Sequence, residues 1–158
     1  MMKEELIMHK LKLISLLIIV FTFVLGTLSA SVYAAGNNHK IAIHLDENDK
    51  GRMNLVLNNA QNVNAYYQSK GDTVEIEVVT YGPGLHMLRT DTSPVKARIA
   101  AMSLQMENLT FAGCQNTQDK MTKKAGKKIT LVSEAKMVPS GVVRLIELQE
   151  SGWAYIRP

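Results

Sequence analysis

Apolar and polar positions repeat along this chain with two different periods, which predict alternating strands and helices. Residues 40–45 (KIAIHL) form an almost continuous apolar run, typical of a buried strand. Residues 51–71 instead carry apolar side chains at helical spacing from Met53 to Tyr67. Residues 73–82 (TVEIEVVTYG) return to the two-residue period of a strand.

The second half of the chain continues this alternation. It predicts helices over residues 93–108, 116–126 and 140–152. The first is capped by Ser93, the second by Asn116 or Thr117, and the third by Ser140. Strands are predicted over residues 109–113 and 153–158. One further strand lies at either 129–132 or 135–138. A strand–helix unit repeated four times and closed by a strand predicts one three-layer α/β domain with a mainly parallel sheet.

The N-terminal residues have the three parts of a secretory signal peptide. Lysines stand in the first twelve residues, residues 13–26 are apolar and uncharged, and small residues follow, with Val32 and Ala34 at a plausible cleavage site. The alternative is an uncleaved anchor, but the apolar run is shorter than the roughly 20 residues that span a bilayer. We therefore predict a signal peptide over residues 1–34 and a mature domain over 35–158, exported to the periplasm and free of the membrane after cleavage.

The positive charge of the chain does not indicate a nucleic-acid partner. The formal net charge is +4, and most of the excess outside the N-terminus is one lysine cluster: Lys120, Lys123, Lys124, Lys127 and Lys128. The cluster has no interleaved aromatic residues and no nucleic-acid-binding motif. A solvated helix face followed by a loop explains it better.

Cys114 is the one cysteine of the chain, so it has no intramolecular disulfide partner. It lies between a predicted strand and a predicted helix, where free backbone N–H groups and the helix dipole favour a thiolate. A buried cysteine serving only as a small apolar side chain is the alternative. We expect a thiol that is at least partly accessible and more reactive than a free cysteine.

The turns that follow the predicted strands should meet at one edge of the sheet, because ligands of open parallel sheets bind beyond the carboxyl ends of the strands. These turns place seven candidate ligand-binding residues near Cys114: Asn48, Tyr81, Gly82, Gly113, Asn116, Ser140 and Gly141. No sequence motif for a cofactor or a metal is present, and we expect neither. A metal or redox site formed by Cys114 with His44 or His86 lacks any supporting local spacing.

Four separated segments resemble the DsrE/DsrF-like sulfur-relay family, most closely its small exported members. They are HLDENDKGRMNLVLNNAQN, VEIEVVTYGPGLHML, FAGCQNT and VPSGVVRLIELQESGWAYIRP, and the resemblance extends from about His39 to Pro158. It implies a flavodoxin-like or Rossmann-like fold in homo-oligomers, trimers or multiples of them. It also implies a cysteine that carries sulfur as a persulfide between partner proteins, and the matching position is Cys114.

Two functions follow as hypotheses. The first is an exported sulfur carrier, sulfurtransferase-like at most, that loads Cys114 and exchanges sulfur with a donor or acceptor protein. The second is a non-catalytic oligomeric module that binds a small ligand or anion, with Cys114 lining its pocket. Apolar helix and loop positions beyond the needs of one sheet face also favour a homo-oligomer, among them Met87, Leu88, Met102 and Met106.

The cleavage site gives a first testable prediction. The exported, purified protein should begin at Ala35, because the small residues before it suit signal peptidase. Intact-mass measurement and N-terminal sequencing check this. An exported protein that still begins with Met1 would contradict it.

Overall fold

The computed structural model of the protein describes residues 3–5, 7–10 and 36–158. The apolar segment of the predicted signal peptide and its cleavage site fall outside these residues. The part from residue 35 onward forms one compact unit. None of the helices in the described ranges has both the length and the apolar character that a membrane crossing requires.

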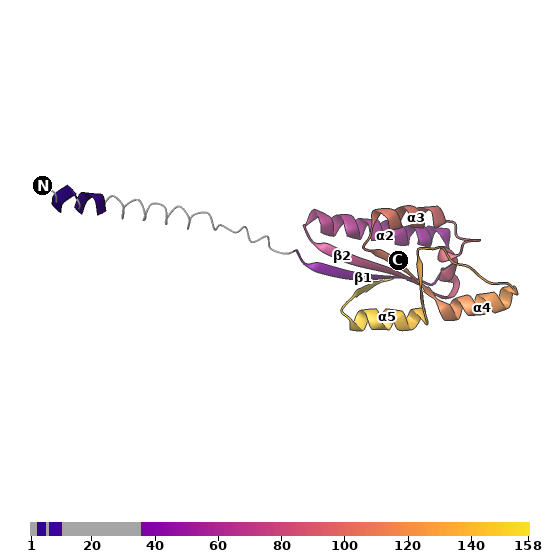
Figure 1. The fold of residues 1–158 in the computed structure, drawn as a ribbon. Helices are drawn as coiled ribbons and strands as arrows, with labels where there is room; N and C mark the ends of the chain where they lie inside the picture. The colour runs from indigo at the N-terminus through magenta and orange to yellow at the C-terminus, as the bar shows by residue number, and fades with distance from the viewer. Residues whose placement is uncertain (1–2, 6, 11–35) are drawn as a thin grey trace. The chain divides into compact units, whose positions relative to one another are not determined.

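The domain is built on a five-stranded sheet in which all paired strands run parallel (Figure 1). Its strands are β1 (Asn38–Leu45), β2 (Thr73–Thr80), β3 (Leu109–Cys114), β4 (Ala135–Val138) and β5 (Ala154–Ile156). Their order across the sheet is β4-β3-β2-β1-β5. This arrangement confirms the predicted α/β class, a three-layer flavodoxin-like domain.

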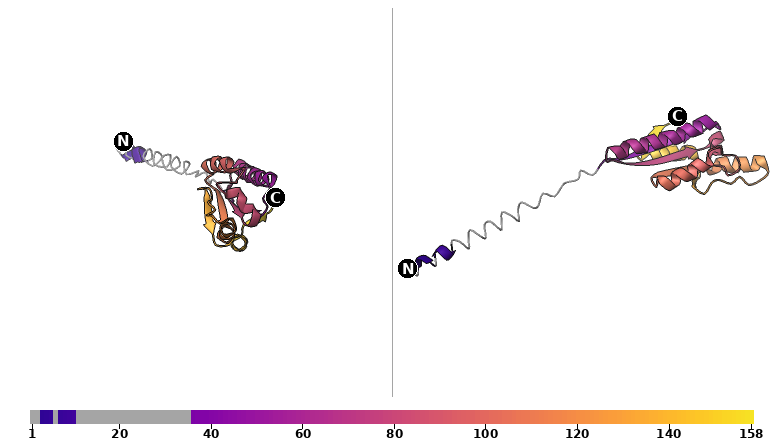
Figure 2. Two further views of the ribbon diagram at one scale, coloured as in Figure 1. Left: turned by 90° about the vertical axis from the view of Figure 1, so that its right-hand side faces the viewer. Right: turned by 90° about the horizontal axis from the view of Figure 1, so that it is seen from above.

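Helices cover both faces of the sheet. They are α2 (Lys50–Ser69), the 3₁₀ helix η1 (Gly82–Leu88), α3 (Lys96–Gln105), α4 (Gln115–Ala125) and α5 (Gly141–Glu150). Helices α2 and α3 lie side by side on one face, and α5 lies on the other (Figures 1 and 2). Helix α4 buries no side chain and extends beyond the carboxyl ends of the strands.

Helix α2 shows how the local sequence produces an element and its orientation. The carboxylate of its N-cap, Asp49, accepts a hydrogen bond of 2.7 Å from the backbone N–H of Arg52. Its buried residues follow helical spacing and form one apolar stripe: Met53, Val56, Leu57 and Ala60. That stripe packs on the sheet and fixes which side of α2 faces inward.

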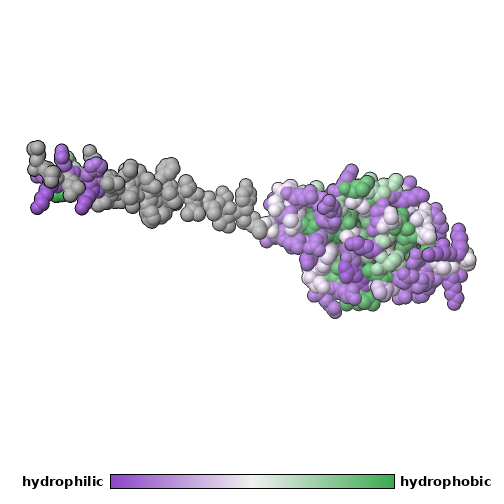
Figure 3. Space-filling model, in the orientation of Figure 1, coloured by the Kyte–Doolittle hydropathy of each residue, from purple (hydrophilic) through white to green (hydrophobic). Residues whose placement is uncertain are grey.

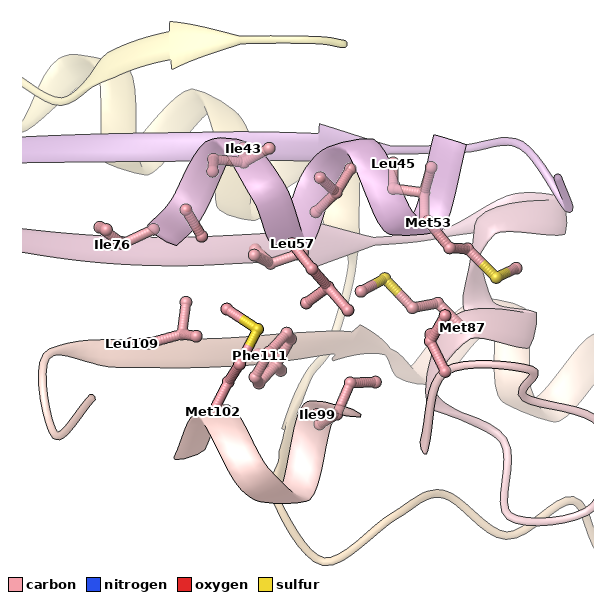
Figure 4. Close-up of a cluster of buried hydrophobic side chains, with 14 of the residues drawn as sticks. Ile43, Leu45, Met53, Leu57, Ile76, Met87, Ile99, Met102, Leu109 and Phe111 are labelled. Atoms are coloured by element: carbon pink, nitrogen blue, oxygen red, sulfur yellow. The ribbon is translucent and has the colours of Figure 1, made fainter. Parts of the chain in front are cut away.

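The larger hydrophobic cluster fills the space between the sheet and helices α2 and α3 (Figure 4). Phe111 of β3 lies among Leu57, Ile99 and Met102, and it is 1% exposed. A smaller cluster on the opposite face joins Leu145 and Leu148 of α5 to small residues of the sheet: Ala42, Val79 and Ala112.

Two details differ from or complete the sequence-based expectations. The open choice of strand falls on 135–138, while Ile129 is buried in a connecting segment and Leu131 makes an isolated bridge with Arg89. The helix expected from Ser93 begins at Lys96, because the Ser93 hydroxyl donates to the carbonyl of Met87 rather than capping the helix.

The apolar residues that were expected to favour a homo-oligomer do not lie on the surface, so that expectation was wrong for these residues. All four of the apolar residues on which it rested are buried in the core of the chain itself: Met87, Leu88, Met102 and Met106. Their side chains are buried by the packing of η1 and α3 on the sheet, so they offer no surface to another subunit.

The core gives a second testable prediction. Replacing Phe111 with alanine should lower the free energy of unfolding by about 3–5 kcal/mol, because it leaves a cavity in a closed cluster. Urea denaturation of the purified domain measures the change. Leu104→Ala is the matched control, since Leu104 is 86% exposed and its removal should change stability by less than about 0.5 kcal/mol. Equal effects of the two substitutions would contradict the packing described.

Candidate functional site

Cys114 occupies the junction between the end of a strand and the start of a helix. It is the last residue of β3, where it pairs with Val138 of β4, and it is also the N-cap of α4. The helix thus begins at Gln115, earlier than expected from the capping preferences of Asn116 and Thr117. The extended backbone of Cys114 continues the strand and leads straight into the first helical turn.

The connections that follow β3 and β4 lead toward opposite edges of the sheet. From β3 the chain passes through α4 to the edge strand β4, and from β4 it returns through α5, on the opposite face from α2 and α3, to β5 at the far edge. In open parallel sheets such divergence leaves a crevice beyond the carboxyl ends of the strands, where ligands bind. Cys114 is the last residue of β3, at this carboxyl edge of the sheet.

Hydrogen-bond donors from two helix starts surround the Cys114 sulfur. The Thr117 hydroxyl and the backbone N–H groups of Asn116 and Thr117 approach it from α4, and the Gly141 N–H approaches it from α5. The Thr117 oxygen accepts a hydrogen bond of 3.0 Å from the Gly82 N–H, which leaves its own hydrogen free to point at sulfur. Among the described residues, the Cys114 side chain makes no capping hydrogen bond to α4.

These donors outweigh the effect of burial on the thiol. Burial raises the pKa of Cys114, but hydrogen bonds from the Thr117 hydroxyl and from the backbone amides of Gly141, Thr117 and Asn116 lower it, and the net pKa lies below the usual value. A thiolate, or another sulfur anion at the same place, is therefore stabilised by the fold.

The thiol is less accessible than the sequence suggested. Cys114 is buried, with 4% of its surface exposed, which contradicts the expectation of a partly accessible side chain. The reason is the first turn of α5, which brings Gly141 onto the sulfur. The same turn lies so close to Tyr81 that a Cβ on Gly141 would be 2.8 Å from the Tyr81 Cβ.

A cluster of aromatic side chains adjoins Cys114 through Tyr81. The Tyr81 ring stacks on His44 at 4.7 Å between centroids, and His44 Nδ1 is 2.7 Å from the Tyr155 hydroxyl. Burial raises the pKa of Tyr81, and Asp46 and Cys114 are among the groups that raise it further. Burial lowers the pKa of His44, an effect that Asp46 opposes. His44 Nε2 is buried, has no hydrogen-bond partner among the described residues, and lies 3.9 Å from an Asp46 oxygen.

A pocket of about 520 Å³ opens next to this site, between η1 and α4. We call it the α4 pocket. It is lined by Asn48, Tyr81, Gly82, Pro83, His86, Thr117, Lys120, Met121 and Lys124. The surface of the domain around α4 is largely hydrophilic (Figure 3). The α4 pocket shares Tyr81, Gly82 and Thr117 with the surroundings of Cys114.

The structure distributes the predicted site residues over three places. The backbone amides of Asn116 and Gly141 lie close to the Cys114 sulfur, Tyr81 lies against Gly141, and Ser140 precedes Gly141 as the N-cap of α5. Asn48 and Gly82 line the α4 pocket. Gly113 is buried on the other side of the sheet, where a Cβ would meet Leu131, Leu85 and Leu88.

Sequence reasoning missed the donor Thr117 and the side chains that follow it along α4. It treated Thr117 as a possible cap and Lys120 and Lys124 as part of a solvated cluster. Their helical spacing from Thr117 was the available signal, since positions three, four and seven residues apart lie on one side of a helix. Among residues 36–158 and the described N-terminal pieces, no group of three His, Cys, Asp or Glu side chains is placed to hold a metal ion.

Fold and site together define an α/β domain with a stabilised thiol at the carboxyl edge of its sheet. No protein-family model matches the chain, and no curated protein matches it either. The solved structure of MTH1491, a protein of unknown function from Methanobacterium thermoautotrophicum, is 32% identical and superposes with a TM-score of 0.64. The match covers 76% of this chain and 99% of that chain, and the chain belongs to the family of that protein.

The donors around sulfur give a third testable prediction. Thr117→Val should raise the pKa of Cys114, because it removes the hydroxyl that contributes most to lowering it, whereas Thr117→Ser should keep it low. Ultraviolet absorbance of the thiolate as a function of pH measures this without requiring a reagent to reach sulfur. An unchanged titration in Thr117→Val would contradict the assignment.

The same shift extends the third prediction to the pH dependence of stability. Because the folded-state pKa lies below the unfolded value of about 8.5, the thiolate stabilises the fold fully above the unfolded pKa, and this contribution is lost as pH falls through the folded pKa. The free energy of unfolding of the wild-type protein should therefore rise relative to Cys114→Ser as pH increases through that window.

Proposed function

We propose that this protein is an exported sulfur carrier of the DsrE/DsrF-like type, in which Cys114 accepts sulfur as a persulfide and passes it to a partner. The observation that carries the proposal is the convergence of amide and hydroxyl donors from α4 and α5 on one sulfur atom. Such donors stabilise an anion, and a terminal persulfide is an anion of the same kind as a thiolate.

The chemistry of a carrier needs little else from the site. The Cys114 thiolate attacks the outer sulfur of a donor persulfide, a new S–S bond forms, and the donor leaves as a thiolate. No general base is required once the thiol is ionised, which agrees with the absence of a histidine hydrogen bond to Cys114 among the described residues. Release to an acceptor is the same exchange in reverse, so the resolving thiol comes from a partner or a small molecule.

The export and assembly of the carrier are part of the proposal. The residues of the N-terminus support a cleaved signal and a periplasmic location, as argued from their sequence. A homo-oligomer, a trimer or a multiple of it, is supported by apolar side chains that remain exposed on β4 and the outer side of α5: Met137, Val142, Val143 and Ile146. Light scattering of the mature protein at micromolar concentration tests the assembly.

A second function is favoured by the α4 pocket. A non-catalytic module could hold a small anion there, with Lys120 and Lys124 supplying positive charge and Cys114 serving only as part of the supporting wall. Under this alternative, a persulfide donor would leave the protein unmodified.

Sulfur loading is therefore the fourth testable prediction. Exposure of the folded wild-type protein to a persulfide donor should add one sulfur atom, as measured by intact mass, because the chain has one cysteine and its surroundings stabilise the product anion. Cys114→Ser should retain the fold, as shown by circular dichroism, and gain no sulfur. A wild-type protein that is loaded only after denaturation would eliminate the carrier function and leave the binding module.

A further inference from the structure

We propose that the α4 pocket binds the sulfur donor, and that this donor is a small thiol persulfide bearing a carboxylate. The inference rests on the proposed carrier function and adds the substrate class to it. The pocket volume of about 520 Å³ falls within the roughly 300–1,000 Å³ typical of small-molecule sites.

The charges of the pocket select an anion. Lys120 and Lys124 lie one helical turn apart on α4, and within the described part of the chain neither makes a salt bridge. Asp46 already binds Arg157 at 2.9 Å, and Glu47 lies 3.7 Å from Arg52. Asp119, next to Lys120 in the chain, accepts a hydrogen bond of 2.7 Å from the side-chain amide of Gln115. A carboxylate on a bound molecule is thus the partner that these two ammonium groups lack.

The rest of the lining suits the body of a small thiol compound. Met121 and Pro83 provide apolar surface between the lysines and the inner wall. The flexible thioether of Met121 can adapt to the shape of a small apolar group. The pocket therefore offers charge at its α4 side and apolar contact toward Tyr81.

The inner wall of the pocket is also the wall of the cysteine site. Thr117 lines the pocket and lies in the first turn of α4, directly after the N-cap Cys114, and its hydroxyl is among the groups that lower the pKa of Cys114. Tyr81 also lines the pocket and lies against Gly141, whose N–H is another of those groups. A donor held by the lysines thus has its sulfur end one side chain away from Cys114. Transfer requires the groups that cover the sulfur to move aside, since Cys114 is 4% exposed.

The transfer balances without an added oxidant or reductant. The Cys114 thiolate attacks the outer sulfur of R–S–SH, and the Cys114–sulfur bond forms as the S–S bond of the donor breaks. The electron pair of that bond leaves with the thiolate R–S⁻. The proton stays on the transferred sulfur during the step and then passes to solvent, which leaves the persulfide anion on Cys114. The carboxylate of R stays beside Lys120 and Lys124 throughout.

Two donors that differ by one carboxylate test the inference as the fifth prediction. They are the persulfides of N-acetylcysteine, which carries the carboxylate, and of N-acetylcysteamine, which lacks it. Time courses of intact mass should show the wild-type protein loading about fivefold faster from the first donor, an effect of the size expected for exposed charge pairs. The preference should weaken at high salt, because salt screens such pairs.

Matched double variants locate the effect. Lys120→Gln with Lys124→Gln should abolish the preference between donors. Lys123→Gln with Lys127→Gln removes the same charge from exposed lysines outside the pocket lining and should keep the preference. A preference that survives in the first variant, or that is lost equally in both, would overturn the pocket assignment while sulfur loading itself still supports the carrier.

A binding measurement separates the two proposals further. S-methyl-N-acetylcysteine cannot donate sulfur, and it should shift the amide resonances of Lys120 and Met121 in the Cys114→Ser protein. Absence of those shifts would overturn the pocket assignment. An acidic protein partner at α4 would then be the alternative. A wild-type protein that loads from neither donor would overturn the carrier function and this inference with it.

Discussion

The ion pair between Arg144 and Glu77 determines how α5 lies on the sheet. Two hydrogen bonds of 2.7 Å join the guanidinium to a carboxylate whose side chain is 9% exposed. An unpaired carboxylate at that depth is costly, so the bidentate pair restricts the rotation and position of α5. One turn earlier, this restriction places Gly141 against Tyr81 and directs its N–H at Cys114. The surroundings of the thiol thus depend on an interaction made elsewhere along the helix.

Burial and hydrogen bonding together decide whether a group at the site is charged, and the outcome differs between Cys114 and His44. Cys114 is buried, but donors from α4 and α5 stabilise its anion and lower the pKa of the thiol. His44 is also buried, yet its Nε2 has no hydrogen-bond partner and burial lowers the pKa of the ring. The fold therefore favours negative charge at sulfur and disfavours positive charge at the neighbouring imidazole. Tyr81 lies between them and contacts both surroundings.

The glycines of the site are explained by close approach of the backbone. A Cβ at Gly141 would lie within 2.9 Å of two Tyr81 atoms, and one at Gly84 would lie 2.2 Å from the Leu45 carbonyl oxygen. Gly84 thereby lets η1 pass directly over the end of β1, and Gly141 lets α5 start over β3. Both approaches narrow the crevice at the carboxyl edge of the sheet and leave the α4 pocket as the opening beside Cys114.

The sequence by itself determined the order and type of the elements and the location of Cys114 at a strand end. The helical spacing of the apolar residues from Met53 to Ala60 is a local property of the sequence, because it requires only that one side of the helix is buried. Tertiary structure alone decided that Gly141 meets the sulfur, that Thr117 donates to it, and that Gly113 faces the other side of the sheet. Those outcomes depend on the position of α5 and the register of β3 against β4, which arise from contacts between residues distant in the chain and leave no periodic signal.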